Sequence, residues 1–128
     1  MNLVDIDNYS PFEINNIKIE PLLVYHGNLP VLGFKFGNFA YITDAKTIPD
    51  STIDLINGID TLVLNAVRLE EHPTHLSLEE ALELFKRLKV KKGYVTHISH
   101  FLGEHDTVSK TLPPNVYLAY DTLKITVN

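Results

Sequence analysis

Histidine is concentrated in one part of this sequence. Five of the six histidines fall between His72 and His105, and the apolar stretch 94–96 leads directly to His97 and, three residues later, His100. Imidazole is the commonest metal ligand in proteins and the usual acid or base near neutral pH. A cluster of imidazoles at the end of an apolar stretch therefore indicates a functional site, although His72 and His105 are expected to be ordinary surface residues.

Three residues, His26, Asp44 and His97, each stand just past an apolar, strand-like stretch. Neutral imidazole and carboxylate are ligand types that zinc, manganese and iron accept, and a carboxylate can bridge two cations. An aspartate after a strand is also a common turn former or helix cap. Spacing alone therefore leaves both interpretations of Asp44 open.

The elements that must position these residues follow from the apolar patterning. Residues 17–25 read as a strand, and residues 31–36 and 39–43 read as a hairpin because Gly37-Asn38 between them tolerates positive φ. A short helix is expected over residues 49–56, ended by Asn57-Gly58. This part of the chain is therefore expected to be mainly antiparallel.

The next part has the pattern of a βαβ unit. Residues 61–67 and 90–95 are apolar strands, and a helix between them begins at Ser77 with a capping box to Glu80. Strands joined in this way run parallel, and sites in such units lie beyond their carboxyl ends. We therefore expect the loop that holds His75 to lie at the same edge of the sheet as His97.

The two ends of the chain are less regular in pattern. Residues 1–16 are rich in turn-forming residues and are expected to be an irregular segment before one domain over residues 17–128. A short helix is expected within residues 104–110, followed by two strands over residues 116–120 and 123–127.

Composition narrows the class of protein. The 128 residues are 45% apolar, enough for one ordinary core, and the formal charge of −5 argues against a nucleic-acid partner. The absence of cysteine excludes disulfides, thiolate metal sites and a cysteine nucleophile. No apolar run is long enough for a membrane span, and no export signal is visible at the start. These features lead us to expect a cytoplasmic protein without membrane partners.

Three strings carry a resemblance to a known family. They are Leu-Leu-Val-Tyr-His at 22–26, Gly-Phe-Lys-Phe leading to Tyr-Ile-Thr-Asp over 33–44, and Tyr-Val-Thr-His-Ile-Ser-His at 94–100. Together they resemble the second half of a metallo-β-lactamase-fold hydrolase. They are most similar to the branch that includes phosphoribosyl cyclic phosphate phosphodiesterase and, more distantly, the transfer-RNA 3′-processing nucleases. The resemblance implies an α/β fold, the C-terminal half of an αββα sandwich.

The resemblance also implies a role for each site residue. His26 would bind a first divalent metal, zinc or manganese, Asp44 would bridge two metals, and His97 would bind the second. His75 would be catalytic, donating a proton to the leaving oxygen of a phosphate ester or holding a phosphate oxygen. His100 would lie on the substrate side. The implied substrate is a small phosphate ester or cyclic phosphate, hydrolysed by metal-activated water.

One family motif is missing. Members carry a His-x-His-x-Asp-His string that supplies most of the remaining ligands, and this sequence has none and no histidine before His26. We therefore expect the 128 residues to be a portion of a hydrolase, inactive alone, whose uncovered sheet meets the N-terminal half or self-associates. The alternative is a non-catalytic binding or interaction module that keeps the fold. A hydrolase that uses a single metal and only these histidines is a third possibility.

Overall fold

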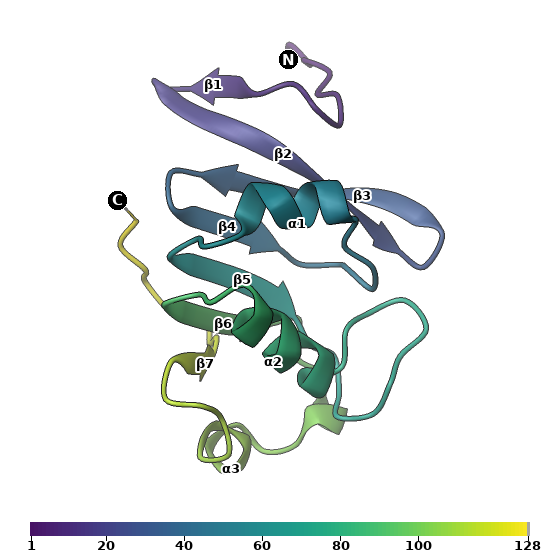
Figure 1. Cartoon of the computed structure of the whole chain (residues 1–128), viewed down its shortest axis with the longest axis vertical. Coiled ribbons are helices and arrows are strands. Elements are labelled where there is room, and N and C mark those ends of the chain that lie inside the picture. Colours follow the sequence, from purple (N-terminus) through teal and green to yellow (C-terminus); the bar gives the residue numbers. More distant parts are fainter. Residues whose placement is uncertain (128) are drawn as a thin grey trace.

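Seven strands form one mixed sheet in which the order of the strands is their order in the chain (Figure 1). This computed structural model describes residues 1–127. The strands are β1 (Phe12–Ile14), β2 (Ile17–His26), β3 (Leu29–Phe36), β4 (Phe39–Ile42), β5 (Thr61–Asn65), β6 (Lys92–Thr96) and β7 (Val116–Leu118).

Strand direction determines which strand ends meet. Strands β1 to β4 are antiparallel to their neighbours, whereas β4, β5, β6 and β7 are parallel. In the register of the parallel part, Ile42 pairs with Leu64 and Leu64 pairs with Val95. Because β2 is two antiparallel steps from β4, it runs in the same direction. The carboxyl ends of β2, β4, β5 and β6 therefore lie at one edge, as the βαβ pattern predicted for the last two.

Two helices, α1 (Asp50–Ile56) and α2 (Leu78–Arg87), cover the same face of the sheet (Figure 1). Helix α2 begins with the expected capping box, in which the Ser77 hydroxyl accepts from the Glu80 N–H and the Glu80 carboxylate accepts from the Ser77 N–H. The apolar side chains between these helices and the sheet form the core. The remaining helices are η1 (His100–Leu102) and α3 (His105–Ser109). Among the described residues, no helix is both long and apolar enough to span a bilayer.

Within residues 1–127, the opposite face of the sheet carries apolar side chains that no helix covers. We call this the open sheet face, and around its groove lie Ile6, Phe12, Ile14, Ile19, Phe34, Phe36, Phe39 and Tyr41. Ile14 is 53% exposed and Tyr41 is 43% exposed. The molecule is thus one sheet with helices on one side, the α/β half of an αββα sandwich that the sequence predicted.

The structure differs from the expectation at both ends of the chain. Phe12–Ile14, in the segment expected to be irregular, forms β1, because Asn15 and Asn16 both adopt positive φ and make a tight turn into β2. Residues 123–127, expected to form a strand, do not pair in the described structure. Residues 124–127 lie near Asp60 and Lys91, at the amino ends of β5 and β6.

Candidate metal and catalytic site

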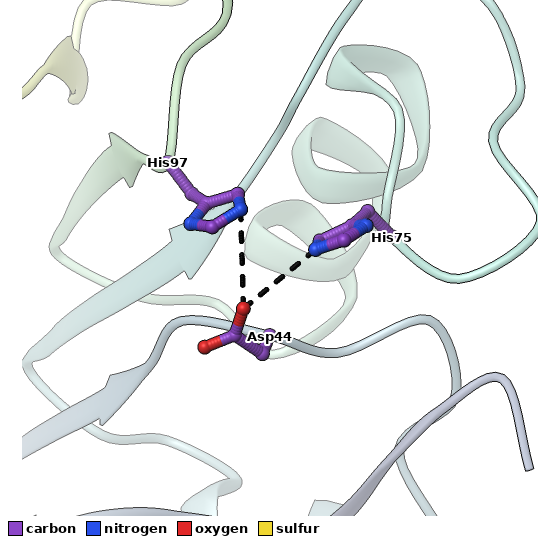
Figure 2. A group of neighbouring side chains, drawn as sticks. All are labelled: Asp44, His75 and His97. Carbon is purple, nitrogen blue, oxygen red and sulfur yellow. Dashed lines mark ion pairs between the residues drawn. The ribbon is translucent and has the colours of Figure 1, made fainter. Parts of the chain in front are cut away.

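One carboxylate and two imidazoles meet at the carboxyl edge of the sheet. Oδ1 of Asp44 lies 3.6 Å from Nε2 of His75 and 3.9 Å from Nε2 of His97 (Figure 2). One ligand atom from each residue lies within 4.8 Å of the other two. The three residues come from the end of β4, the loop before α2 and the end of β6, so the parallel register brings together residues that are far apart in sequence.

Asp44 presents a single free carboxylate oxygen to the two imidazoles. Its Oδ2 accepts a hydrogen bond from the Thr43 hydroxyl at 2.7 Å, and Oδ1 is the atom that faces His75 and His97. The hydrogen bond from Thr43 lowers the pKa of Asp44 and outweighs its partial burial, and the nearby imidazoles lower it further. Asp44 is therefore a carboxylate at neutral pH, the form that binds a cation.

Asn65, the last residue of β5, fixes the backbone immediately after Asp44. Its side-chain oxygen accepts from the Ala45 N–H at 2.8 Å, and its side-chain nitrogen donates to the Ala45 carbonyl at 2.9 Å. The same carbonyl also accepts from the N–H of Leu76 at 2.9 Å. Because Leu76 follows His75, one fully buried amide holds the segments that carry both Asp44 and His75.

His75 lies at the centre of a group of four imidazoles. Its ring centroid is 4.5 Å from that of His26, 4.8 Å from that of His97 and 5.0 Å from that of His72. Burial lowers the pKa of His75, and the positive charge that His26, His97 or His72 would carry when protonated lowers it further, whereas Asp44 raises it. The net shift is downward, which favours the neutral imidazole.

His26 reaches the site from β2 and is held there by the chain after Asp44. The backbone of Tyr25 exchanges hydrogen bonds with Thr47 and also accepts from the N–H of Lys46 at 2.8 Å. Its neighbour His26 then packs edge-on against His75, with the ring planes 89° apart. The predicted neighbourhood of His26, Asp44, His75 and His97 is therefore present, although the tightest group contains His75 in place of His26.

His97 has an unusual backbone conformation for a residue that is not glycine, with φ at 58°. The turn is fixed on both sides, because the Thr96 carbonyl accepts from the Ala66 N–H and the Ser99 N–H donates to the Val67 carbonyl. This left-handed turn ends β6 and presents the imidazole to Asp44 instead of continuing the strand.

Of the other three histidines, one differs from the prediction in its burial. His72, expected to be an ordinary surface residue, is half-buried against His75, and its Nδ1 accepts from the Thr74 N–H at 3.2 Å. His105 is exposed, as expected. His100 is exposed in η1, and its ring contacts Phe101.

Two residues at the site were missed by the sequence analysis. Asn65 lies in an otherwise apolar run, and a buried polar residue at the end of such a run is a signal that could have found it. Thr74 contacts Nδ1 of both His72 and His75 through its hydroxyl. No sequence signal distinguishes it from other loop threonines.

The donor set fits a divalent cation. Two ligand atoms bound to one tetrahedral zinc ion at about 2.0–2.1 Å lie about 3.3 Å apart. The separations of 3.6 and 3.9 Å between Asp44 and the two imidazoles are wider than this, and all three ligand atoms lie within 4.8 Å of one another, so the side chains would move inward to bind an ion. One carboxylate and two or three imidazoles are also the ligand types that zinc and manganese accept.

This combination of fold and site defines the class as metallo-β-lactamase-fold proteins, and comparison with known proteins agrees. Residues 1–98 match the model of the family described as beta-lactamase superfamily domain. The chain belongs to this family.

A solved structure is similar over almost the whole chain. It is described as a new diphosphatase from the PhnP family, and it matches with a TM-score of 0.91 and 36% identity over 96% of this chain and 48% of that one. A curated relative, an octanoyltransferase of Porphyromonas gingivalis, is 30% identical over 100% of this chain and 26% of its own length. The chain thus spans about a quarter of the curated relative and about half of the structural one.

More distant structures show the fold alone. The metallo-β-lactamase fold protein YhfI from Bacillus subtilis matches with a TM-score of 0.71 and 19% identity, over 91% of this chain and 52% of that one. The short form of human tRNase Z matches with a TM-score of 0.68 and 19% identity, over 91% of this chain and 46% of that one. Both confirm that the sheet and its helices are half of this sandwich.

Proposed function

We propose that this chain supplies one side of the active site of a metal-dependent phosphodiesterase. The observation that carries the proposal is the free oxygen of Asp44, which faces the Nε2 atoms of His75 and His97 at the carboxyl edge of a metallo-β-lactamase sheet. Functional support comes from the similarity to a protein described as a diphosphatase, which is 36% identical over 96% of this chain.

In this proposal the side chains have separate tasks. His26, Asp44 and His97 would hold divalent metal, zinc or manganese. A bound cation of this kind supplies a water of low pKa as nucleophile and stabilises charge on the phosphate. His75 contacts the phosphate from the loop before α2, and the exposed His100 meets the organic part of the substrate. The substrate class is a small phosphate ester or cyclic phosphate.

The proposal requires residues beyond this site. A tight zinc site uses three or four protein ligands, and the ligands proposed here are one carboxylate, that of Asp44, and two imidazoles, those of His26 and His97, for two cations. We therefore propose that a His-x-His-x-Asp-His segment of the other half completes the site and packs on the open sheet face. The 128 residues by themselves should then have little activity.

The octanoyltransferase relative does not change this proposal. The chain aligns with 26% of that protein, and this share does not assign octanoyl transfer to the matched part. The feature of this chain that supports our proposal is the set of histidines and aspartate at the carboxyl edge, which are metal-ligand types and not an acyl-transfer nucleophile.

The decisive experiment is hydrolysis of bis(p-nitrophenyl) phosphate by the full-length protein, including any residues that its gene encodes beyond these 128. We expect activity that a chelator abolishes and that zinc or manganese restores. Asp44→Asn should abolish it, whereas Asp54→Asn, on the exposed side of α1, should not. Chelator-resistant hydrolysis would contradict the proposal. Metal binding without hydrolysis of any phosphate ester would favour the alternative, a binding module that keeps the fold.

A further inference from the structure

The hydroxyl of Thr74 lies between two imidazoles. Its Oγ1 is 3.0 Å from Nδ1 of His75 and 3.3 Å from Nδ1 of His72. A hydroxyl has one proton to donate, and an unprotonated imidazole nitrogen has one lone pair to accept it. The direction of these contacts therefore determines which ring nitrogen of His75 carries the proton.

The lone pair on Nδ1 of His72 is already in use. It accepts from the backbone N–H of Thr74 at 3.2 Å, so neutral His72 carries its proton on Nε2. The Thr74 hydroxyl then has its better acceptor in Nδ1 of His75, which is both closer and otherwise free. Donation to this atom leaves the proton of neutral His75 on Nε2.

The other side of the His75 ring favours the same tautomer. Nε2 of His75 faces Oδ1 of Asp44 at 3.6 Å, and Asp44 is ionised. With the proton on Nδ1, a bare lone pair would face a carboxylate oxygen, which is repulsive. With the proton on Nε2, an N–H points toward negative charge, which is attractive.

The rotamer of Thr74 is fixed by packing. Gly27, which follows His26, has φ at +61°, and a Cβ placed on it would lie 3.1 Å from the Thr74 methyl group. The methyl group therefore rests on the glycine backbone, and the hydroxyl is directed to the opposite side, toward the imidazoles.

We propose that Thr74 is a positioning residue that keeps His75 in its Nε2–H tautomer, so that His75 donates a hydrogen bond to a non-bridging phosphate oxygen. The phosphate ligand in this assignment rests on the proposed function. The tautomer of His75 does not depend on the proposed function. In this form His75 is neither a metal ligand nor a proton donor to the leaving group, because its lone pair is occupied by Thr74 and a neutral imidazole is a very weak acid. The ligand class is a phosphate diester or diphosphate anion.

The tautomer can be read directly by long-range ¹H–¹⁵N correlation spectra of the histidine side chains. The 128-residue chain is used without metal at pH about 8, above the usual histidine pKa of about 6.5. We expect His75, assigned by comparison with His75→Gln, to show a protonated Nε2 and a hydrogen-bonded, unprotonated Nδ1. A protonated Nδ1 in the native chain overturns the proposal whatever the variants do.

Two variants test the part played by the hydroxyl. Thr74→Val keeps the volume and should remove the hydrogen-bond shift of His75 Nδ1 and mix the two tautomers, whereas Thr74→Ser should keep the native spectrum. Backbone amide spectra show whether each variant is folded. An unchanged Nδ1 signal in folded Thr74→Val would overturn the assignment.

The consequence for catalysis is measured in the protein as encoded. Thr74→Val should lose about 10- to 100-fold in kcat/KM, the range found when the hydrogen-bond partner of a metal-binding histidine is removed, and Thr74→Ser should retain most of the native value. The loss should be equal for p-nitrophenyl and phenyl esters, because the hydrogen bond is to a non-bridging oxygen. A loss confined to the phenyl ester would identify His75 as an acid and overturn this role. If the native protein hydrolyses neither ester, the proposed function fails, and the tautomer remains decided by the spectra.

Discussion

At the scale of single residues, the site is built around one oxygen atom. Thr43 occupies one oxygen of the Asp44 carboxylate, and the other faces His75 and His97. The hydrogen bond from Thr43 restricts rotation of the carboxylate and leaves its other oxygen directed to the imidazoles. An ion bound there would meet ligands that need little reorganisation, which lowers the entropic cost of binding.

The role of His97 as a metal ligand predicts a loss of metal in His97→Ala. The expected result is a clear fall in zinc uptake by the 128-residue chain, measured by elemental analysis after dialysis, since one of the few available ligands is gone. His105→Ala is the matched control, because His105 is an exposed histidine that lies outside the imidazole group. Equal zinc content in the two variants would show that the visible residues do not bind the metal.

The sequence could predict which residues gather at the carboxyl edge better than which residues hold them there. His26, Asp44 and His97 were identified by their positions after strands and His75 through the family resemblance, and the structure places the four near one another, while their chemical roles stay predictions. The contact of His72 with His75 was missed, because it depends on how the loop folds back. Thr74 was missed for the same reason: its role lies in hydrogen bonds to neighbours whose rotamers the sequence does not specify.

At the scale of elements, the site depends on how β4 and β5 end. The apolar run predicted a strand over residues 61–67, but β5 ends at Asn65. The reason is that the Asn65 side chain pairs with the backbone of Ala45, and the chain then turns toward the histidine loop. The polar residue at the end of the strand thus belongs to the site and not to the hydrophobic core.

Asn65→Ala should therefore destabilise the chain and loosen the site. It leaves the buried N–H of Ala45 without its partner, and an unsatisfied buried group costs about 1–3 kcal/mol. We expect a loss of this size in the free energy of unfolding, measured with urea, together with weaker zinc binding. Asn115→Ala is the control, since it removes one bond to the Val90 carbonyl at an exposed position away from the site. A smaller loss for Asn65→Ala than for the control would contradict this role.

Most of the regular elements could be predicted from pattern. The turn at Gly37-Asn38, the capping box at Ser77 and the parallel pair of β5 and β6 follow from local sequence chemistry, and the structure confirms them. The prediction of a strand over residues 123–127 was wrong. The β propensity of these residues is a local property, whereas a strand also needs a neighbouring strand to pair with. The position of the tail near Asp60 is decided by tertiary packing.

At the scale of the whole molecule, the most prominent feature is a sheet with one uncovered face. Contiguous exposed apolar surface of this kind marks an interaction site. The aromatic side chains there include Phe39 and Tyr41, whose rings lie nearly parallel with centroids 6.5 Å apart. Our proposal that the other half of the sandwich packs here predicts that the 128-residue chain, when alone, covers this face with a second copy.

Sedimentation at high protein concentration should then show a dimer. Tyr41→Lys places a charge on the open sheet face and should shift the chain to monomer, because the charge would have to be buried in the interface. Leu55→Lys is the matched control, since Leu55 is similarly exposed, at 46%, on α1 and away from that face. A native chain that sediments as a monomer at every concentration would contradict this prediction.

The strands lie in the sheet in the same order as in the chain, and this order affects how the chain folds. Each strand pairs with its immediate predecessor, so no strand waits for a distant segment before it can add to the sheet. The turns between the antiparallel strands β1 to β4 are two residues long, so closing them costs little entropy, whereas the parallel strands β4 to β7 are joined by long crossovers that cost more and fold more slowly. During synthesis the antiparallel part can therefore pair first, and the metal-binding site would form only when β6 delivers His97.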